Sequence, residues 1–150
     1  MAALIPNIAK GRFARYADLP EASDGLVWIL LALAGLVSDA VLRDYDTVAD
    51  ILAGASAEAT FTGYARVAAT SVVVTVDDTN DRVDVDAADP QWNPTSSEAL
   101  GKIVLAYDGD TAAGTDANLT PLFADDFAVT TATSGTLDYE VNAAGWGRAS

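Results

Sequence analysis

Aspartate side chains are the most concentrated chemical groups in this chain. A dense run contributes Asp77, Asp78, Asp81, Asp84, Asp86 and Asp89. Calcium takes six or more oxygen ligands, so an acidic run of this kind raises the question of a calcium site. The spacing does not fit an EF-hand, and Asp108-Gly-Asp110 begins like a calcium loop but continues with Ala112, Ala113 and Leu119 at ligand or turn positions. Acids on turns and exposed strand faces, which discourage edge pairing, explain the same residues, and we expect no metal site.

Carboxylates and hydroxyls are also the only groups left for catalysis, because the chain has no histidine and no cysteine. Two acids could flank a sugar bond as in glycosidases. No local motif, however, would hold one of them protonated in an apolar cleft. Ser71, Ser96 and Ser97 have no histidine to act as their base. We therefore expect no enzyme, no catalytic residue and no cofactor.

The net charge restricts the partners. The chain carries 22 acidic against 8 basic residues, a formal charge of -14. Phosphate affinity comes mainly from Lys and Arg, so nucleic acid and anionic membrane are unfavourable partners. The apolar run Leu26–Val37 is shorter than the roughly 20 residues that a membrane-spanning helix needs. We expect neither nucleic acid nor membrane as a partner.

Alanine accounts for much of the 51% hydrophobic content, which predicts a thin core for 150 residues. A thin core and strong self-repulsion favour stabilisation by other chains. We expect a homo-oligomer, and symmetric closure suggests a trimer.

Two regions differ in organisation. Residues 1–24 lack sustained periodicity and contain Pro6 and Pro20, which predicts an extended N-terminal arm with at most one short strand near 11–16. Residues 25–150 predict a single β-rich domain.

Within that domain, Leu26–Leu33 is continuously apolar and fits a strand buried on both faces, although its Leu and Ala content would also suit a helix. A short helix is predicted near 46–53, because apolar residues recur at three- and four-residue spacing after a group of acids, one of which we expect to cap it. Gly54 is expected to end it in the left-handed conformation.

Period-two patterns predict two hairpins. The first pairs Val74 with Val85 and Val76 with Val83 around the loop 78–81. The second sets Phe127, Val129 and Thr131 against Leu137, Tyr139 and Val141, around a loop in which Gly135 takes a positive φ.

The stretch 102–107 predicts an interior strand, and 108–118 a long exposed loop, whereas the proline-flanked stretch 89–94 predicts a connection. The expected fold is α+β and mainly β, with antiparallel hairpins forming a small sandwich or a barrel-like domain and one short helix.

Five residues are candidates for an interface. Lys10, Arg12 and Arg15 make the N-terminal segment locally basic on an acidic body. Trp92 and Trp146 lie beside Pro or Gly in segments with few apolar neighbours, which favours an interface over the core, where we place Trp28.

A longer signature is carried by a series of segments that cover about two thirds of the chain, namely Gly35–Asp46, Phe61–Arg66, Val72–Asp86, Asp89–Trp92, Lys102–Asp108, Gly114–Asn118, Pro121–Leu122 and Asp126–Thr130. Together they resemble small virion proteins of tailed phages that are typically encoded near the major capsid protein. The resemblance implies a structural virion component, of the kind labelled minor capsid or head decoration, and it brings no catalytic motif.

Charge favours the outer surface of the head, since packaged DNA would repel a polyanion. We therefore expect a capsid decoration or minor capsid protein bound to the major capsid protein, located in the phage virion and in the host cytoplasm during assembly. The nearest alternative is a head-to-tail connector or tail component. Such a protein would be present in far fewer copies per particle than a decoration protein. A calcium- or glycan-binding surface module is the alternative from another class.

Overall fold

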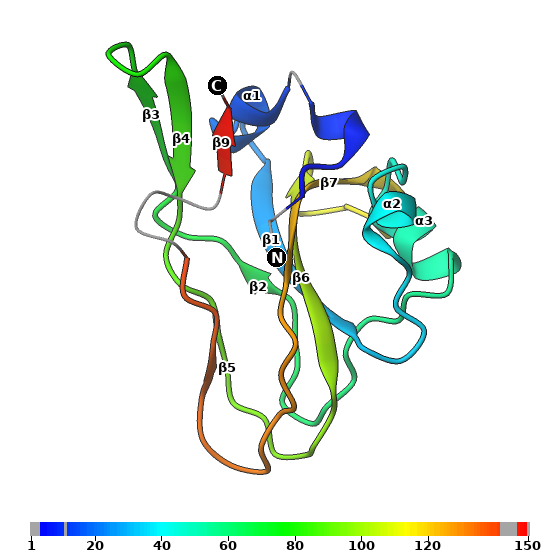
Figure 1. Ribbon diagram of the computed structural model, residues 1–150. Helices are drawn as coiled ribbons and strands as arrows, with labels where there is room; N and C mark the ends of the chain where they lie inside the picture. The colour runs from blue at the N-terminus through cyan, green and yellow to red at the C-terminus, as the bar shows by residue number, and fades with distance from the viewer. Residues whose placement is uncertain (1–3, 11, 142–146, 150) are drawn as a thin grey trace.

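The computed structural model describes residues 4–10, 12–141 and 147–149, the last three through their backbone only (Figure 1). Its helical segments are η1 (Asn7–Ala9), α1 (Phe13–Ala17), α2 (Asp39–Leu42), α3 (Val48–Ala53) and η2 (Asp116–Asn118). Its strands are β1 (Gly25–Ala32), β2 (Val67–Ala68), β3 (Val73–Asp77), β4 (Arg82–Asp86), β5 (Gln91–Trp92), β6 (Leu100–Asp108), β7 (Leu119–Asp126), β8 (Leu137–Asp138) and β9 (Gly147–Ala149).

An antiparallel sheet in the order β2-β1-β6-β7 forms the centre of the molecule. Strands β1 and β6 pair along their length, with Trp28 opposite Leu105 and Leu26 opposite Tyr107. The predicted strands at 26–33 and 102–107 are thus confirmed as strands. Sheets of the orders β3-β4-β9 and β5-β8 lie beside the central sheet. The described strands form no closed barrel, so the fold is mainly β but the barrel-like alternative is wrong.

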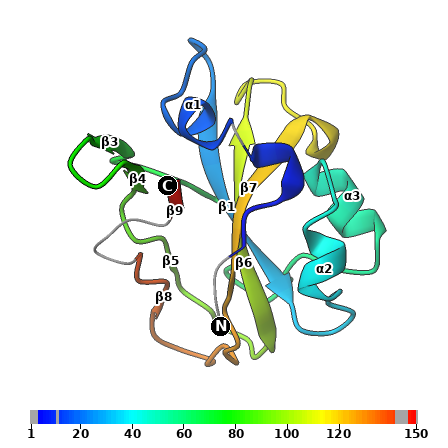
Figure 2. The same cartoon turned by 45° about the horizontal axis from the view of Figure 1, so that its top comes forward.

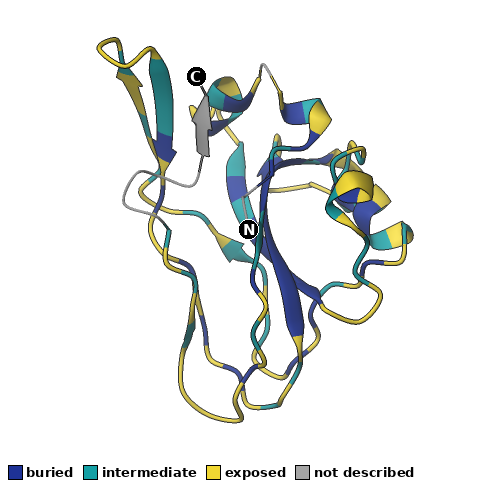
Figure 3. Ribbon diagram, viewed as in Figure 1, coloured by how far each residue is buried: buried dark blue, intermediate teal, exposed yellow. Residues whose placement is uncertain are grey.

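Successive side chains of a strand point to opposite faces of the sheet. The central strands are covered on both faces, so they bury side chains on each. On one face Trp28 packs in a cluster that includes Leu105, Trp92 and Val85. On the other face Ile29 packs with residues of α2 and α3, including Leu42, Val48 and Ile51. Figure 2 shows α2 and α3 on one side of the sheet and the β3–β4 hairpin on the other, and in Figure 3 most of β6 is buried. Each large side chain so buried contributes about 1.5–3 kcal/mol.

A buried lysine joins the sheet to a helix. Lys102 on β6 is only 3% exposed. Its Nζ lies 2.5 Å from Asp126 Oδ1 on β7 and 2.8 Å from Asp39 Oδ1 on α2. Burial opposes the ammonium charge, but the hydrogen bonds to the two carboxylates outweigh it and raise the pKa of Lys102. The lysine is therefore held charged, and it fixes α2 against the sheet.

The N-terminal segment packs on the body, so the expectation of an extended arm is wrong for its described residues. Leu4 and Ala124 exchange backbone hydrogen bonds of 2.8 and 2.9 Å. The structure has the helix α1 over Phe13–Ala17, where at most a short strand was expected. Phe13 and Ala17, four residues apart, share the buried face of this helix.

Helix α3 confirms the helix predicted near 46–53. Its cap is Thr47, which was not the expected acid; Thr47 Oγ1 accepts a hydrogen bond from Asp50 N–H while the Asp50 carboxylate accepts one from Thr47 N–H, forming a capping box. Gly54 ends the helix as expected, but its φ of -83° is not left-handed, and the positive φ belongs to Ala55. Helix α2 was not anticipated.

The first predicted hairpin is confirmed in register: β3 and β4 pair Val74 with Val85 and Val76 with Val83. The second is wrong. Thr130 pairs with Ala99, and Leu137 of β8 pairs with Trp92 of β5, so the 89–94 connection contains a two-residue strand. Gly135 nevertheless has the expected positive φ, 101°.

Gly63 and Gly135 offer a matched test of the packing. Both have positive φ, yet a Cβ on Gly63 would clash with Asn93 O, whereas one on Gly135 meets nothing within 4 Å. Gly135→Ala should lower the free energy of unfolding by about 1 kcal/mol, the backbone term alone. Gly63→Ala should cost about 2 kcal/mol more, from the added clash. Urea denaturation measures both, and equal costs would contradict the close approach of residues 63 and 93.

Candidate functional site

A pocket of about 430 Å³ opens beside α1. It is lined by Arg12, Arg15, Tyr16, Pro20, Glu21 and Tyr107. Two of the predicted interface residues, Arg12 and Arg15, thus meet at one site and are both exposed. Lys10, the third basic residue predicted for an interface, is also exposed, and its Nζ donates a hydrogen bond to Asn7 Oδ1. It does not line the pocket.

Ring stacking and hydrogen bonds fix the aromatic side of the pocket. Tyr16 stacks on Tyr107 of β6, with ring centroids 4.6 Å apart. The Tyr107 hydroxyl donates to Asp24 Oδ2 at 2.9 Å, and the same oxygen accepts from Glu21 N–H at 2.8 Å. Burial and this hydrogen bond raise the pKa of Tyr107 to about 12, so the ring stays neutral at physiological pH. The stacked rings of Tyr16 and Tyr107 thus form an aromatic side of the pocket beside the two arginines.

Arg12 and Arg15, like Lys10 and Arg43, have no acidic partner among the described residues. Arg66 and Lys102 each form ion pairs with two acids, and so does Arg82. Arg12 and Arg15 form no ion pair or side-chain hydrogen bond with any described residue. Guanidinium groups bind carboxylates and phosphates through paired N–H donors. The two guanidinium groups are thus available to an anionic group from outside the chain, although Glu21 also lines the pocket.

The β3–β4 hairpin projects from the body, and its loop lies at the periphery in Figures 1 and 2. Its edge strand β3 exposes apolar surface: Val76, near the loop, is 66% exposed, and Val73, at the base of the hairpin, is 54% exposed. The Asp77 carboxylate accepts hydrogen bonds from Thr79 N–H and from Asn80, which lowers the pKa of Asp77 and shapes the loop. The hairpin therefore presents both apolar and acidic groups to solvent.

The tryptophan predictions have separate outcomes. Trp92 is 3% exposed and its indole N–H donates to Ala65 O at 2.8 Å, so its assignment to an interface is wrong. The pairing of β5 with β8 brings it against the central sheet, and this contact is not visible in the local sequence. Trp28 is in the core as expected. Trp146 lies outside the described residues.

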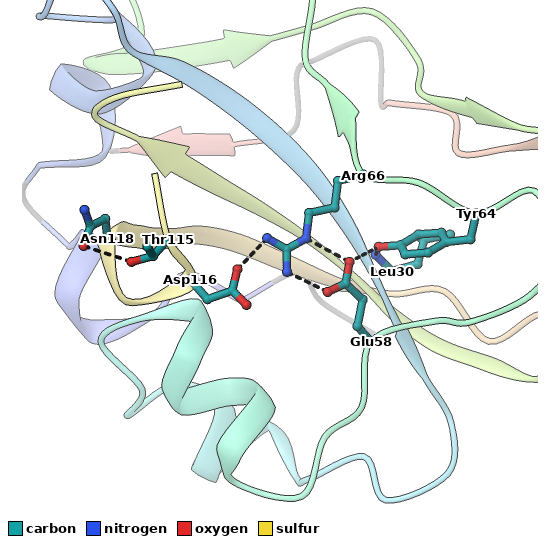
Figure 4. A network of polar contacts seen from close by, with 7 residues as sticks. All are labelled: Leu30, Glu58, Tyr64, Arg66, Thr115, Asp116 and Asn118. Atoms are coloured by element: carbon teal, nitrogen blue, oxygen red, sulfur yellow. Dashed lines mark hydrogen bonds and ion pairs between the residues drawn. The ribbon is translucent and has the colours of Figure 1, made fainter. Parts of the chain in front are cut away.

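A network of polar side chains joins three distant segments (Figure 4). Arg66 binds both carboxylate oxygens of Glu58, at 2.8 and 2.6 Å, and Asp116 Oδ1 at 2.6 Å. The Tyr64 hydroxyl donates to Glu58 Oε1 and accepts from Leu30 N–H. The Glu58 hydrogen bonds raise the pKa of Arg66 further, whereas burial and then the bond to Glu58 raise the pKa of Tyr64.

The network is a structural clamp. It joins the loop after β6 to β1 through side chains that are hydrogen-bonded to one another. The sequence pattern did not predict it, because Arg66 and Asp116 are 50 residues apart.

Some of the acidic residues singled out in the sequence stabilise local turns, whereas Asp84 and Asp86 lie on β4. Asp108 Oδ1 accepts from Asp110 N–H, and Asp110 Oδ1 accepts from Ala112 N–H. Across the described ranges no group of three or more acids is arranged to hold a metal ion. Within the same ranges no helix is long and apolar enough to cross a membrane.

Comparisons of the chain with protein-family models, with curated proteins and with solved structures found no match.

Replacing Arg66 tests the clamp. Arg66→Ala leaves the half-buried carboxylates of Glu58 and Asp116 without their cation, and should lower the free energy of unfolding by about 1–2 kcal/mol. Arg12→Ala, which removes an exposed arginine with no described partner, should change it by less than about 0.5 kcal/mol. Chemical denaturation at low protein concentration gives both values. If the two substitutions cost the same, the network does not stabilise the fold.

Proposed function

We propose that this chain is a structural protein of a tailed-phage virion, a decoration or minor capsid protein that binds the major capsid protein on the outer surface of the head. The assignment to a phage rests on the resemblance of the sequence segments to small virion proteins of tailed phages. The observation that carries the binding role is the projecting β3–β4 hairpin, on which Val73 and Val76 remain exposed.

An exposed hairpin of this kind is costly for a protein that stays alone in solution. Edge strands with exposed apolar residues tend to pair or dock, and aspartates along them limit indiscriminate pairing. The edge strand of this hairpin is β3, which exposes Val73 and Val76, and the loop that follows it carries Asp78 and Asp81. These acids limit random contacts, while the outer end of the hairpin remains free for a specific one.

The charge distribution supports an outer location. A net charge of -14 would be repelled by packaged DNA inside a head. The exposed Arg12 and Arg15 give the same molecule a local basic site with which to contact a neighbour. A coat protein gains affinity from many weak contacts repeated over a lattice, and assembly as a symmetric oligomer, which we propose to be a trimer, multiplies them.

Addition of the purified chain to empty heads of its own phage tests this function. The chain should co-sediment with the heads to a saturating level, and reconstruction should show added density distributed over the outer surface. An unrelated protein of similar negative charge serves as the control and should remain in the supernatant. Failure to co-sediment would contradict the proposal, as would density confined to the neck.

A further inference from the structure

We infer that the pocket beside α1 binds the tip of the β3–β4 hairpin of a second copy of this chain, with Arg12 and Arg15 holding Asp78 and Asp81. This inference deepens the proposed function, because it rests on the self-association that the coat role uses. It assigns that self-association to two named surfaces of the molecule.

The two aspartates at the hairpin tip are available to another chain. Asp78 and Asp81 are exposed and form no side-chain hydrogen bond or ion pair with the described part of the chain, whereas neighbouring Asp77 is engaged within the loop. Asp78 and Asp81 stand at the two ends of the four-residue loop that closes the Asp77–Arg82 pair. Their charges therefore face solvent at the end of the hairpin.

The spacings of the two charge pairs match. The first and last Cα atoms of a tight four-residue turn are less than about 7 Å apart. Arg12 caps α1 and Arg15 is its third residue, so the two share one side of a single turn. Residues three apart on a helix have Cβ atoms about 5–6 Å apart. Each carboxylate can thus meet its own guanidinium group.

An apolar contact accompanies the charges. Val76, at the outer end of β3, is 66% exposed. The pocket offers the Tyr16 ring and Pro20 beside the arginines, and adjacent Leu19 is 37% exposed. Docking of the hairpin tip would cover these groups together, which adds the apolar contact that ion pairs between exposed residues lack.

We take the partner to be another copy, because in one molecule β3 and β4 already lie beside α1, and the base of the hairpin is fixed there. Val85 and Ala87 are buried in the core, and the loop points away from the body in Figures 1 and 2. A contact between a hairpin and a different surface on the next copy is head-to-tail. Such a contact closes into a ring when the rotation between copies fits, which is compatible with a trimer.

Sedimentation velocity over a concentration series tests the contact with the full chain. Asp78→Asn with Asp81→Asn should weaken self-association at least about tenfold, although it reduces the net negative charge and hence the general repulsion. Asparagine tolerates the positive φ of 50° at position 81, so the loop should keep its shape. The control, Asp46→Asn with Glu140→Gln, makes the same change of charge at exposed acids elsewhere and should leave association unchanged or slightly stronger.

Charge reversal supplies the second arm. Arg12→Glu with Arg15→Glu should abolish association, and adding Asp78→Lys with Asp81→Lys in the same chain should restore it. An unaltered oligomer in the asparagine variant, no restoration in the fourfold variant, or a wild-type monomer at all concentrations would overturn the inference.

Head binding separates this inference from the proposed function. Loss of head binding in the asparagine variant with an intact oligomer would assign the hairpin tip to the capsid protein and also overturn the inference. Co-sedimentation of the wild-type chain with heads would still stand as support for the proposed function in each of these cases.

Discussion

Burial of β1 and β6 on both faces is the constraint on which the rest of this structure depends. Trp28 and Ile29 are neighbours in sequence, yet they belong to the cores on opposite sides of the sheet. Two covering layers are therefore required, and short elements supply them: α2 and α3 on one side, and α1 with the small sheets on the other. Helices and hairpins of this length are marginal alone, so their stability comes from packing on the central strands.

The few basic residues of this chain have two different roles. In an acidic chain with 8 basic residues, Lys102 and Arg66 are used to attach covering elements to the sheet. A buried ion pair offsets its own desolvation only when its geometry is good, and both sites have two carboxylates per cation. Arg12 and Arg15 take no part in this internal attachment. Their position in an exposed pocket is what links the fold to the proposed contact between copies.

Local pattern was enough to predict the elements whose signal lies within one segment. The apolar run of β1, the helix near 46–53 and the β3–β4 register were all predictable from spacing. Long-range pairing was not: the association of β5 with β8 places Trp92 in the core, although its flanking prolines suggested an exposed connection.

Helix α1 was missed because five residues are too few for a periodic signal, and its burial depends on what lies beneath it. For the candidate site, the basic character of residues 10–15 was predictable, but the pocket that Arg12 and Arg15 form with Tyr107 required the fold.

Amide hydrogen exchange of the chain alone and in its assembled state tests most directly the claim that a two-faced core carries exposed docking elements. The account predicts the slowest exchange in β1 and β6, faster exchange at the outer end of the β3–β4 hairpin, and new protection on assembly at the hairpin loop and around α1. Hairpin amides as protected as those of β6 in the free chain, or assembly without new protection at either surface, would contradict it.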